Sequence, residues 1–295
     1  MNLADVEWFV ALAETPHMTQ VAERLNTTQP TLSRSLARLE HQIGAPLFDR
    51  VNRRLRLNPS GEVLLRHARR SLLELRAATE HIRSLRDPEH GTVRLGFLHS
   101  VATWLAPELI RGFRARAPQV RFALTQAATY ELEALVADGM VDLAVTGPRP
   151  TDESLAWHPI HTEQLCLVVP RDHRLADRGS VGIADAAGEP FILLGPDFGL
   201  RRLTDDLLAQ VGADPAVAFE SAEIATMESL AAAGLGVTVV PRPRPHRADP
   251  NAAYIRLSDD AAHRVLGLVW PEGGPESPVV RRFRDFVVAQ EWAAL

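Results

Sequence analysis

Arginine side chains recur on one face of a predicted helix near the N-terminus. The helix begins near Gln29, and at about 100° per residue one side of it carries mainly small and basic residues. That side consists of Pro30, Ser33, Arg34, Ala37, Arg38 and His41. Small residues allow close approach, and guanidinium groups bind oxyanions through paired hydrogen bonds. This face is therefore predicted to contact a negatively charged surface.

A second group of arginines follows this helix. Between Asp49 and Arg70 the sequence holds seven Arg, and Asp49 and Glu62 are the only acidic residues there. Four of these arginines surround a predicted strand–turn–strand hairpin: Arg50, Arg53, Arg54 and Arg56. Such a hairpin can lie along a phosphate backbone. Its arginines would then give affinity and salt sensitivity, while the helix face gives sequence discrimination.

The basic helix itself is predicted from its capping and its apolar spacing. Thr28 is the expected N-cap, which puts Pro30 in the first turn, where the amide that proline lacks has no partner. One apolar stripe then runs along the helix through Leu32, Leu36, Leu39 and Ile43. Taken alone, this pattern also fits an ordinary amphipathic helix with a solvated arginine face.

The residues before the basic helix favour a more specific interpretation. A first helix is predicted from the apolar stripe Leu3, Val6, Phe9, Val10 and Ala13. A second, short helix runs from a cap at Thr19 to Leu25, and the turn Asn26-Thr27 leads into the basic helix. This order of short helix, tight turn and basic helix is the helix-turn-helix arrangement, whose last helix enters the major groove of DNA.

The composition indicates a basic head on an acidic body. A chain of 295 residues that is 46% hydrophobic is expected to form more than one domain. Residues 1–90 contain 13 Arg and 11 acidic residues, a net charge of +2, whereas residues 91–295 contain 19 Arg and 26 acidic residues, a net charge of −7. We therefore expect only the N-terminal part to meet phosphate.

Several classes of protein and site are disfavoured. Cys166 is the sole cysteine, which excludes an internal disulfide and a cysteine metal cluster. His158 and His161 have a ligand-like spacing, but no third candidate ligand stands near them in the sequence. No apolar run approaches the ~18 residues that span a bilayer, and MNLADVEWFV lacks the basic flank of a secretion signal. We expect a soluble, cytoplasmic protein without a membrane partner, a metal or a cofactor.

The segment VAERLNTTQPTLSRSLARLEHQIGAPLFDRVNRRLRLNPSGEVLL resembles the N-terminal winged helix-turn-helix domain of the LysR-type transcriptional regulators. The elements AERL, TQPTLSR, LE, IG, PLFDR and the Gly61 turn occur in the family's order and spacing. The departures are small. Met18 stands where the family usually has an aromatic residue, Val21 where it usually has Ala, and Asn58 where it usually has Thr. With the residues beside its motifs, the resemblance implies a DNA-binding set of Thr28, Gln29, Pro30, Thr31, Ser33, Arg34, Arg38, Arg50, Arg53 and Arg54.

A long helix is predicted from Pro59 to about Arg86. Its apolar positions alternate spacings of three and four: Leu65, Ala68, Leu72, Leu75, Thr79 and Ile82. This seam can pack on the protein itself or on a partner chain. The second alternative is favoured, because two winged domains must be held together to read two half-sites. The resembled family uses this helix for dimerisation.

After Gly91, short strands alternate with helices, which predicts parallel sheets with crossover helices. The segments VDLAVTG, LCLVVPRDHRLA and AAGLGVTVVP resemble recurring parts of the LysR effector domain. The predicted fold class is α+β multidomain: a winged helix-turn-helix at 1–58, a linker helix at 59–87, and a two-lobed α/β periplasmic-binding-protein-like effector domain at 91–295. Lobe I is expected at about 91–161 and 267–295, and lobe II at about 162–266.

Two lobes joined by two crossings create a cleft, and loop residues at helix N-termini are its expected ligand contacts. The candidates are Ser100, Thr103, Thr129, Phe198, Gly199, Arg201, Ser221, Glu223 and Ile224. Converging helix N-termini attract anions, which favours a small carboxylate or another anionic metabolite as effector. Serine and threonine at helix starts can also serve only as caps.

The leading hypothesis is a transcription regulator in which the effector shifts lobe closure and the linker helices pass the change to paired wings on DNA. Its expected partners are duplex DNA, the effector and further copies of the chain, as a dimer or the tetramer typical of the family; RNA polymerase is another candidate. A solute-binding protein is the alternative, against which the basic N-terminal 58 residues and the missing export signal argue. An enzyme is the third, but the sequence offers no nucleophile–base pair or metal set.

Overall fold

The computed structural model describes residues 2–15, 17–51, 54–86, 90–244, 248–273, 276–290 and 292. Contacts within the chain divide it into two compact units. Unit 1 comprises residues 1–83 with 138–140, and unit 2 comprises residues 84–137 with 141–295.

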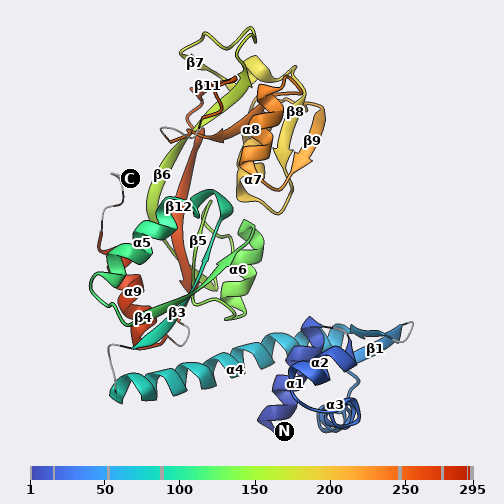
Figure 1. Ribbon diagram of the computed structural model, residues 1–295. Helices are drawn as coiled ribbons and strands as arrows, with labels where there is room; N and C mark the ends of the chain where they lie inside the picture. The colour runs from blue at the N-terminus through green and yellow to red at the C-terminus, as the bar shows by residue number, and fades with distance from the viewer. Residues whose placement is uncertain are drawn as a thin grey trace. The chain divides into compact units, whose positions relative to one another are not determined.

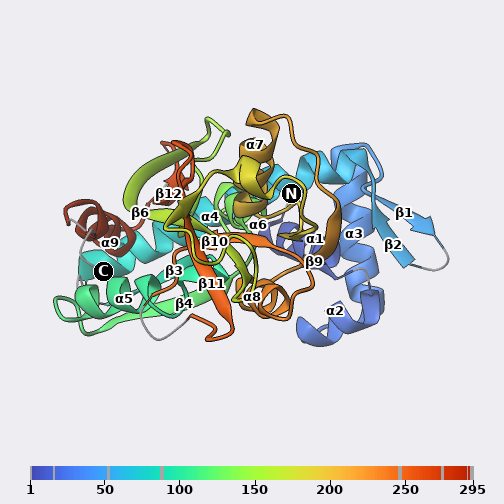
Figure 2. The same cartoon turned by 90° about the horizontal axis from the view of Figure 1, so that it is seen from above.

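Unit 1 contains short helices, a two-stranded hairpin and most of a long helix (Figures 1 and 2). In chain order these are α1 (Leu3–Glu14), α2 (Met18–Arg24), α3 (Gln29–Ile43), β1 (Phe48–Val51), β2 (Arg54–Leu57) and α4 (Pro59–Arg86). The predicted helix-turn-helix and hairpin are confirmed, although α2 begins after His17 rather than after a Thr19 cap. The core of the unit includes Phe9, Leu12, Leu32, Leu39 and Leu47.

The start of α3 has the predicted geometry. The side chain of Thr28 accepts a hydrogen bond from the Thr31 amide, and proline occupies the first turn. The helix ends at Gly44, whose φ of 81° lies in the left-handed region that glycine adopts readily. The predicted apolar stripe is one residue too long, because Ile43 in the last turn is 42% exposed.

The long helix α4 has the predicted bounds, Pro59–Arg86. Asn58 caps it by accepting a hydrogen bond from the Gly61 amide at 2.9 Å, and its own amide group donates to Pro46 O at 3.0 Å. Gly61 is required there, because a Cβ atom would lie 2.2 Å from Leu47 O. Only part of the predicted apolar seam is buried. Ala68 and Leu72 are buried in unit 1, whereas Leu75 and Ile82 are 49% and 59% exposed.

Unit 2 is built around one mixed sheet. Its strands are β3 (Gly91–Phe97), β4 (Val120–Gln126), β5 (Leu143–Thr146), β6 (Leu155–Pro170), β7 (Ser180–Val181), β10 (Thr238–Pro241), β11 (Ala252–Leu257) and β12 (His263–Pro271). The strand order is β4-β3-β5-β12-β6-β11-β7, and β10 also pairs with β6. A separate parallel pair consists of β8 (Phe191–Leu194) and β9 (Val217–Ser221).

The predicted parallel sheet with crossover helices is wrong for part of this sheet. β3 is parallel to β4 and β5, but β12, β10 and β11 are antiparallel to β6. The cause is the 16-residue strand β6, which pairs with β12 along its first part and with β10 and β11 along its last part. The antiparallel pairs of this sheet involve β6 or β12. β7 and β11 were not predicted from the sequence.

Two separate apolar cores define the lobes of unit 2. The core of lobe I joins buried residues from Val93 to Ile160 with those from Leu266 to Trp292, and the core of lobe II lies between Leu165 and Ala262. Lobe I carries α5 (Leu105–Arg114), α6 (Thr129–Ala137) and α9 (Pro278–Val288); lobe II carries α7 (Gly199–Gln210) and α8 (Ile224–Ala232). In Figure 1, β6 and β12 run from one lobe towards the other.

The last helix returns to lobe I, as predicted from the sequence. α5 and α9 lie side by side there (Figure 2), and the rings of Phe113 and Phe283 meet edge to face with centroids 5.2 Å apart. α9 ends at Val288 rather than near Trp292, although Trp292 still packs into the same core. Among the described residues, none of the helices combines the length and the apolar character needed to cross a bilayer.

Candidate DNA-binding face and ligand cleft

The first turns of α3 present an open polar face. Thr28, Gln29, Pro30, Thr31 and Arg34 are exposed, and Ser33 is partly exposed. The hydroxyl groups of Thr28 and Thr31 lie 2.8 Å apart and hydrogen-bond each other. Arg34 forms no ion pair with any residue that the structure describes. Its guanidinium is therefore available to an external acceptor.

Arg38, on the same face, has an internal partner. Its Nε donates to Asp5 Oδ2 at 3.0 Å, its Nη2 donates to Asp5 Oδ1, and Ser35 Oγ donates to Asp5 Oδ1 at 2.5 Å. Asp5 is 2% exposed, whereas the Arg38 side chain is 53% exposed. The hydrogen bond from Arg38 lowers the pKa of Asp5 and outweighs the opposing effect of burial. Arg38 thus joins α3 to α1, and its free edge alone remains for DNA.

Asp5 was not singled out in the sequence. A signal was present, because Asp5 precedes Phe9 and Leu12 at the spacing of one helix face, which puts an acid on the buried stripe of α1. A buried carboxylate needs a charged or polar partner.

The hairpin forms the predicted antiparallel pair, in which Phe48 lies opposite Leu57 and Asp49 lies opposite Arg56. Arg56 is exposed. Arg53 and the side chains of Arg50 and Arg54 lie outside the described residues, so their contact with DNA stays a prediction.

A cleft of about 500 Å³ lies between the two lobes of unit 2. Seven of the nine predicted effector contacts line it: Ser100, Thr103, Thr129, Phe198, Gly199, Glu223 and Ile224. Arg201 and Ser221 do not. Arg201 donates to Glu220 at 2.8 Å, to Asp205 at 3.0 Å and to Leu194 O at 2.9 Å, and Ser221 Oγ accepts a hydrogen bond from the Glu223 amide. Their polar groups are occupied within lobe II.

Thr129 lines the cleft but joins the lobes directly. Its hydroxyl donates to Gly147 O at 3.3 Å and accepts from the Gly199 amide at 3.0 Å. Thr129 is 1% exposed, so this hydroxyl already has a donor and an acceptor of its own. A Cβ atom on Gly199 would lie 2.2 Å from Gly147 O, which explains glycine at this close approach. The main role of Thr129 in this structure is the contact between α6 and α7.

Charged residues that sequence reasoning missed also line the cleft: Glu163, Glu228, Arg242, Arg244 and Arg264. Arg264 and Glu163 neutralise each other, with Nη2 and Oε2 2.5 Å apart and both side chains nearly buried. Arg242 and Arg244 have no ion pair with the described residues. The signal was the run VVPRPRP, which places two arginines between prolines directly after a predicted strand.

The Arg244 guanidinium lies over the Trp104 ring, with its Cζ 3.5 Å from the ring centroid. Burial lowers the pKa of Arg244 and raises the pKa of Glu228, whose carboxyl also meets the Tyr254 hydroxyl. The apolar part of the lining includes Leu98, Trp104, Leu194, Phe198, Ile224 and Pro241. An apolar cleft with a few convergent polar groups is the usual form of a small-molecule site.

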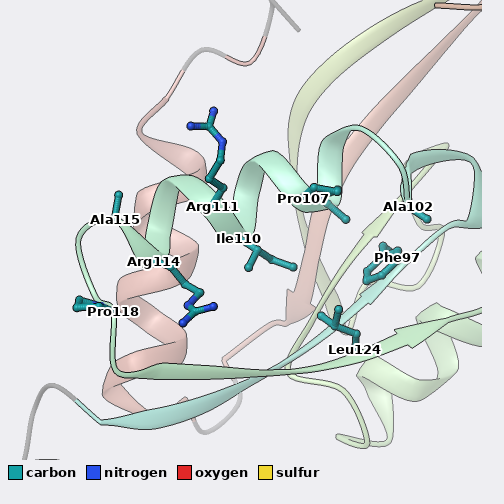
Figure 3. Close-up of a pocket in the computed structure, with 10 residues that line it drawn as sticks. Phe97, Ala102, Pro107, Ile110, Arg111, Arg114, Ala115, Pro118 and Leu124 are labelled. Carbon is teal, nitrogen blue, oxygen red and sulfur yellow. The ribbon is translucent and has the colours of Figure 1, made fainter.

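A second groove of about 640 Å³ runs along α5 on lobe I. Figure 3 shows Ile110 extending from α5 towards the strands that carry Phe97 and Leu124, while Arg111 extends away from them. Among the described residues that line it, Arg111 and Arg114 carry charge, and Arg111 is paired with Glu108. Few polar groups converge there, so the cleft between the lobes is the better candidate for a small ligand.

No group of three or more His, Cys, Asp or Glu is placed to hold a metal ion within the described ranges. His161 contacts Trp292 O through its Nδ1 at 3.0 Å and meets the Trp104 ring edge to face. Cys166 is buried, and burial raises the pKa of its thiol to about 11.

Two family models match separate parts of the chain. Residues 3–62 match the model of the bacterial regulatory helix-turn-helix protein, lysR family, and residues 86–292 match that of the LysR substrate binding domain. The uncharacterized HTH-type transcriptional regulator YybE of Bacillus subtilis is 36% identical over 289 residues, which cover 98% of this chain and 99% of YybE.

Solved structures share the fold. A full-length OxyR from Pseudomonas aeruginosa, in which one cysteine is replaced by aspartate, has a TM-score of 0.73 at 23% identity, covering 97% of this chain and 94% of that one. Full-length CbnR in complex with its target DNA has a TM-score of 0.69 at 21% identity, covering 98% and 99%. The chain therefore matches both the helix-turn-helix and the substrate-binding domain of one family. It belongs to the LysR family of DNA-binding transcriptional regulators.

Proposed function

We propose that this regulator reads duplex DNA through the first turns of α3 and the β1–β2 hairpin, and that an anionic small molecule in the cleft between the lobes controls its binding. The proposal of an anionic ligand rests on Arg242 and Arg244. Both line the cleft, and neither has an ion pair among the described residues. A cleft that holds two arginines without ion pairs favours an anion.

Contacts with DNA are assigned by position on α3. Arg34 and Gln29 are exposed on the turns that would enter the major groove, where arginine pairs with guanine and glutamine with adenine. Thr28, Thr31 and Ser33 add short polar groups, and Pro30 allows close approach. Arg38 would contact phosphate with the edge that Asp5 leaves free. On the hairpin, Arg50, Arg53, Arg54 and the exposed Arg56 would lie along the backbone.

Two copies of the chain would act together. Leu75 and Ile82 continue the apolar seam of α4 and are largely exposed. A second copy of α4 would remove them from water and place two winged domains at neighbouring half-sites. Dimers, or tetramers made from them, are the proposed assembly.

Ligand control would act through the relative position of the lobes. The lobes already meet at Thr129 and Gly199 and at Trp104 and Arg244. A ligand that contacts both lobes favours the lobe arrangement that binds it better, by no more than the difference between its affinities for the two arrangements.

The test is a gel-shift titration of the full-length chain on the DNA upstream of its own gene. We expect specific retardation whose affinity falls steeply between about 50 and 200 mM salt, as phosphate contacts require. The affinity should change when small carboxylates are added. Binding of random duplex DNA with equal affinity would contradict sequence-specific regulation, and binding that no anion alters would contradict the effector part alone.

A further inference from the structure

Trp104 and Arg244 are 140 positions apart in the sequence and belong to different lobes. Trp104 lies between β3 and α5, and its indole Nε1 donates to Ser100 O at 2.9 Å, which fixes the ring. Arg244 follows β10, whose backbone pairs with β6 in lobe II. The stacked pair therefore closes part of the cleft from both sides.

The geometry of the pair determines which ligand charge the cleft can accept. A guanidinium over an indole ring occupies the ring face that would otherwise attract a cationic ligand. The N–H groups at the edge of a stacked guanidinium remain available, and their planar fork fits a carboxylate through two hydrogen bonds. Arg244 is partly buried and has no ion pair with described residues, so it lacks an anion in direct contact. The charge of Glu163 acts on it from farther away and only partly opposes the lowering of its pKa by burial.

The other charged groups of the cleft do not supply that anion. Glu163 is paired with Arg264 at 2.5 Å. Glu228 has a raised pKa, caused first by burial, and its carboxyl meets the Tyr254 hydroxyl. Glu223 is exposed at the start of α8. Arg242, the remaining cation, is exposed, so water already compensates much of its charge.

We propose that Arg244, held against Trp104, is the residue that selects a carboxylate group, and that the ligand is a compact monocarboxylate with an apolar body. This inference rests on the proposed function of the cleft and adds the residue and the chemical class. The apolar body follows from the walls formed by Leu194, Phe198 and Ile224, and the compact size follows from a volume of about 500 Å³. A ligand bound there would touch both Trp104 and Arg244, which together form a contact between the lobes.

Three probes with one apolar body test the charge preference: cyclohexanecarboxylate, cyclohexanecarboxamide and cyclohexylammonium. Dissociation constants for the full-length chain are measured by isothermal titration calorimetry at physiological salt. We expect the carboxylate to bind about tenfold more tightly than the amide, as one charge-assisted bidentate contact implies, and the ammonium to bind most weakly. Equal binding of carboxylate and amide, or no carboxylate binding up to about 20 mM, overturns the proposal.

Three variants test which residue causes the preference for the carboxylate over the amide. In Arg244→Gln the carboxylate and the amide should bind within about twofold of each other, and Arg244→Lys should keep part of the preference, because it retains charge without the planar fork. Arg256→Gln is the matched control, because Arg256 is an exposed arginine of lobe II outside the cleft lining, and this variant should keep the preference for the carboxylate. A preference that survives Arg244→Gln, or that Arg256→Gln abolishes equally, rejects Arg244 as the selecting residue. Circular dichroism confirms that each variant is folded.

Gel shifts on the same preparations distinguish the role of Arg244 in ligand binding from the proposed function of the protein. Specific DNA binding without a carboxylate preference refutes only the role of Arg244. A carboxylate preference that depends on Arg244, in a protein whose DNA affinity the probe does not change, supports the site and refutes ligand control of DNA binding. Absence of specific DNA binding refutes the proposed function, whatever the cleft binds.

Discussion

Arg38 of α3 and Asp5 of α1 form a salt bridge between a half-exposed guanidinium and a buried carboxylate. Arg38 reaches Asp5 through both Nε and Nη2, and Ser35 donates a third hydrogen bond to the same buried carboxylate. The pair links α1 to α3 beside the polar face that carries Arg34, one turn earlier on α3.

Asp5→Ala should destabilise the domain by about 2–3 kcal/mol, because it leaves the buried Ser35 hydroxyl and one edge of Arg38 without their acceptor. Chemical denaturation followed by circular dichroism measures the change, with Glu7→Ala, an exposed acid on the same helix, as the control. The pKa of Asp5 is lowered in the folded state. Its contribution is therefore present above its unfolded pKa near 3.8 and lost as the pH falls through the lower folded value. Equal stability of the two variants would contradict this role.

Arg34→Ala should reduce sequence preference more than affinity for random DNA. If Arg34 pairs with a guanine, its loss costs about 1–3 kcal/mol at that position of the site only. The measurement is a gel-shift comparison of the specific site with single-base variants. Arg56→Ala on the hairpin is the informative control, because loss of a phosphate contact should weaken all duplexes alike and reduce the salt slope by about one. The idea fails if Arg34→Ala weakens every sequence equally.

Local features of the sequence predicted the helices well, and distant pairings were missed. Thr28, Pro30 and Asn58 act within one turn of their own helices, so capping rules were sufficient to place α3 and α4. The salt bridge of Asp5 spans 33 positions, and the stacking of Arg244 on Trp104 spans 140, so each depends on the fold rather than on spacing.

The same reason explains where the lining of the ligand cleft differs from the expected contacts. Ser221 and Arg201 were chosen because they lie near helix starts, but groups of lobe II satisfy their side chains. Thr129 was expected to contact the ligand and does line the cleft, but Gly147 and Gly199 already hydrogen-bond its hydroxyl. Satisfaction of a polar group is decided by residues brought near in space, and a helix start alone does not reveal it.

Thr129→Val should loosen the contact between the lobes. Valine keeps the shape of the side chain but leaves the buried Gly199 amide without its acceptor, which costs about 1–3 kcal/mol. Thermal unfolding of the variant should begin at a lower temperature, and hydrogen exchange should increase at the start of α7. Thr129→Ser retains the hydroxyl and should lose much less. Identical exchange at Gly199 in the valine variant and the native chain would refute the inter-lobe role.

Glu133 on α6 should make the stability of unit 2 depend on pH near neutrality. Burial, and secondarily the charge of Asp152, raise its pKa to about 7, while Arg202 opposes the shift. Since the folded pKa exceeds the unfolded value near 4.5, the folded state holds the proton more tightly. The stabilising contribution is then complete below about pH 4.5 and is lost as the pH rises through about 7. Solvent screening keeps the effect at this half-exposed site to about 1 kcal/mol or less.

Glu133→Gln removes this dependence, because the amide resembles the protonated carboxyl at every pH. The variant should match the native chain near pH 5 and unfold at a higher temperature near pH 8, a difference that calorimetric scans at both pH values detect. Glu131→Gln, an exposed neighbour on the same helix, is the control and should leave the pH profile unchanged. A lower unfolding temperature for Glu133→Gln at pH 8 would show that the ionised carboxylate is held by Arg202 strongly enough to outweigh its burial, and would reverse the sign argued for this group.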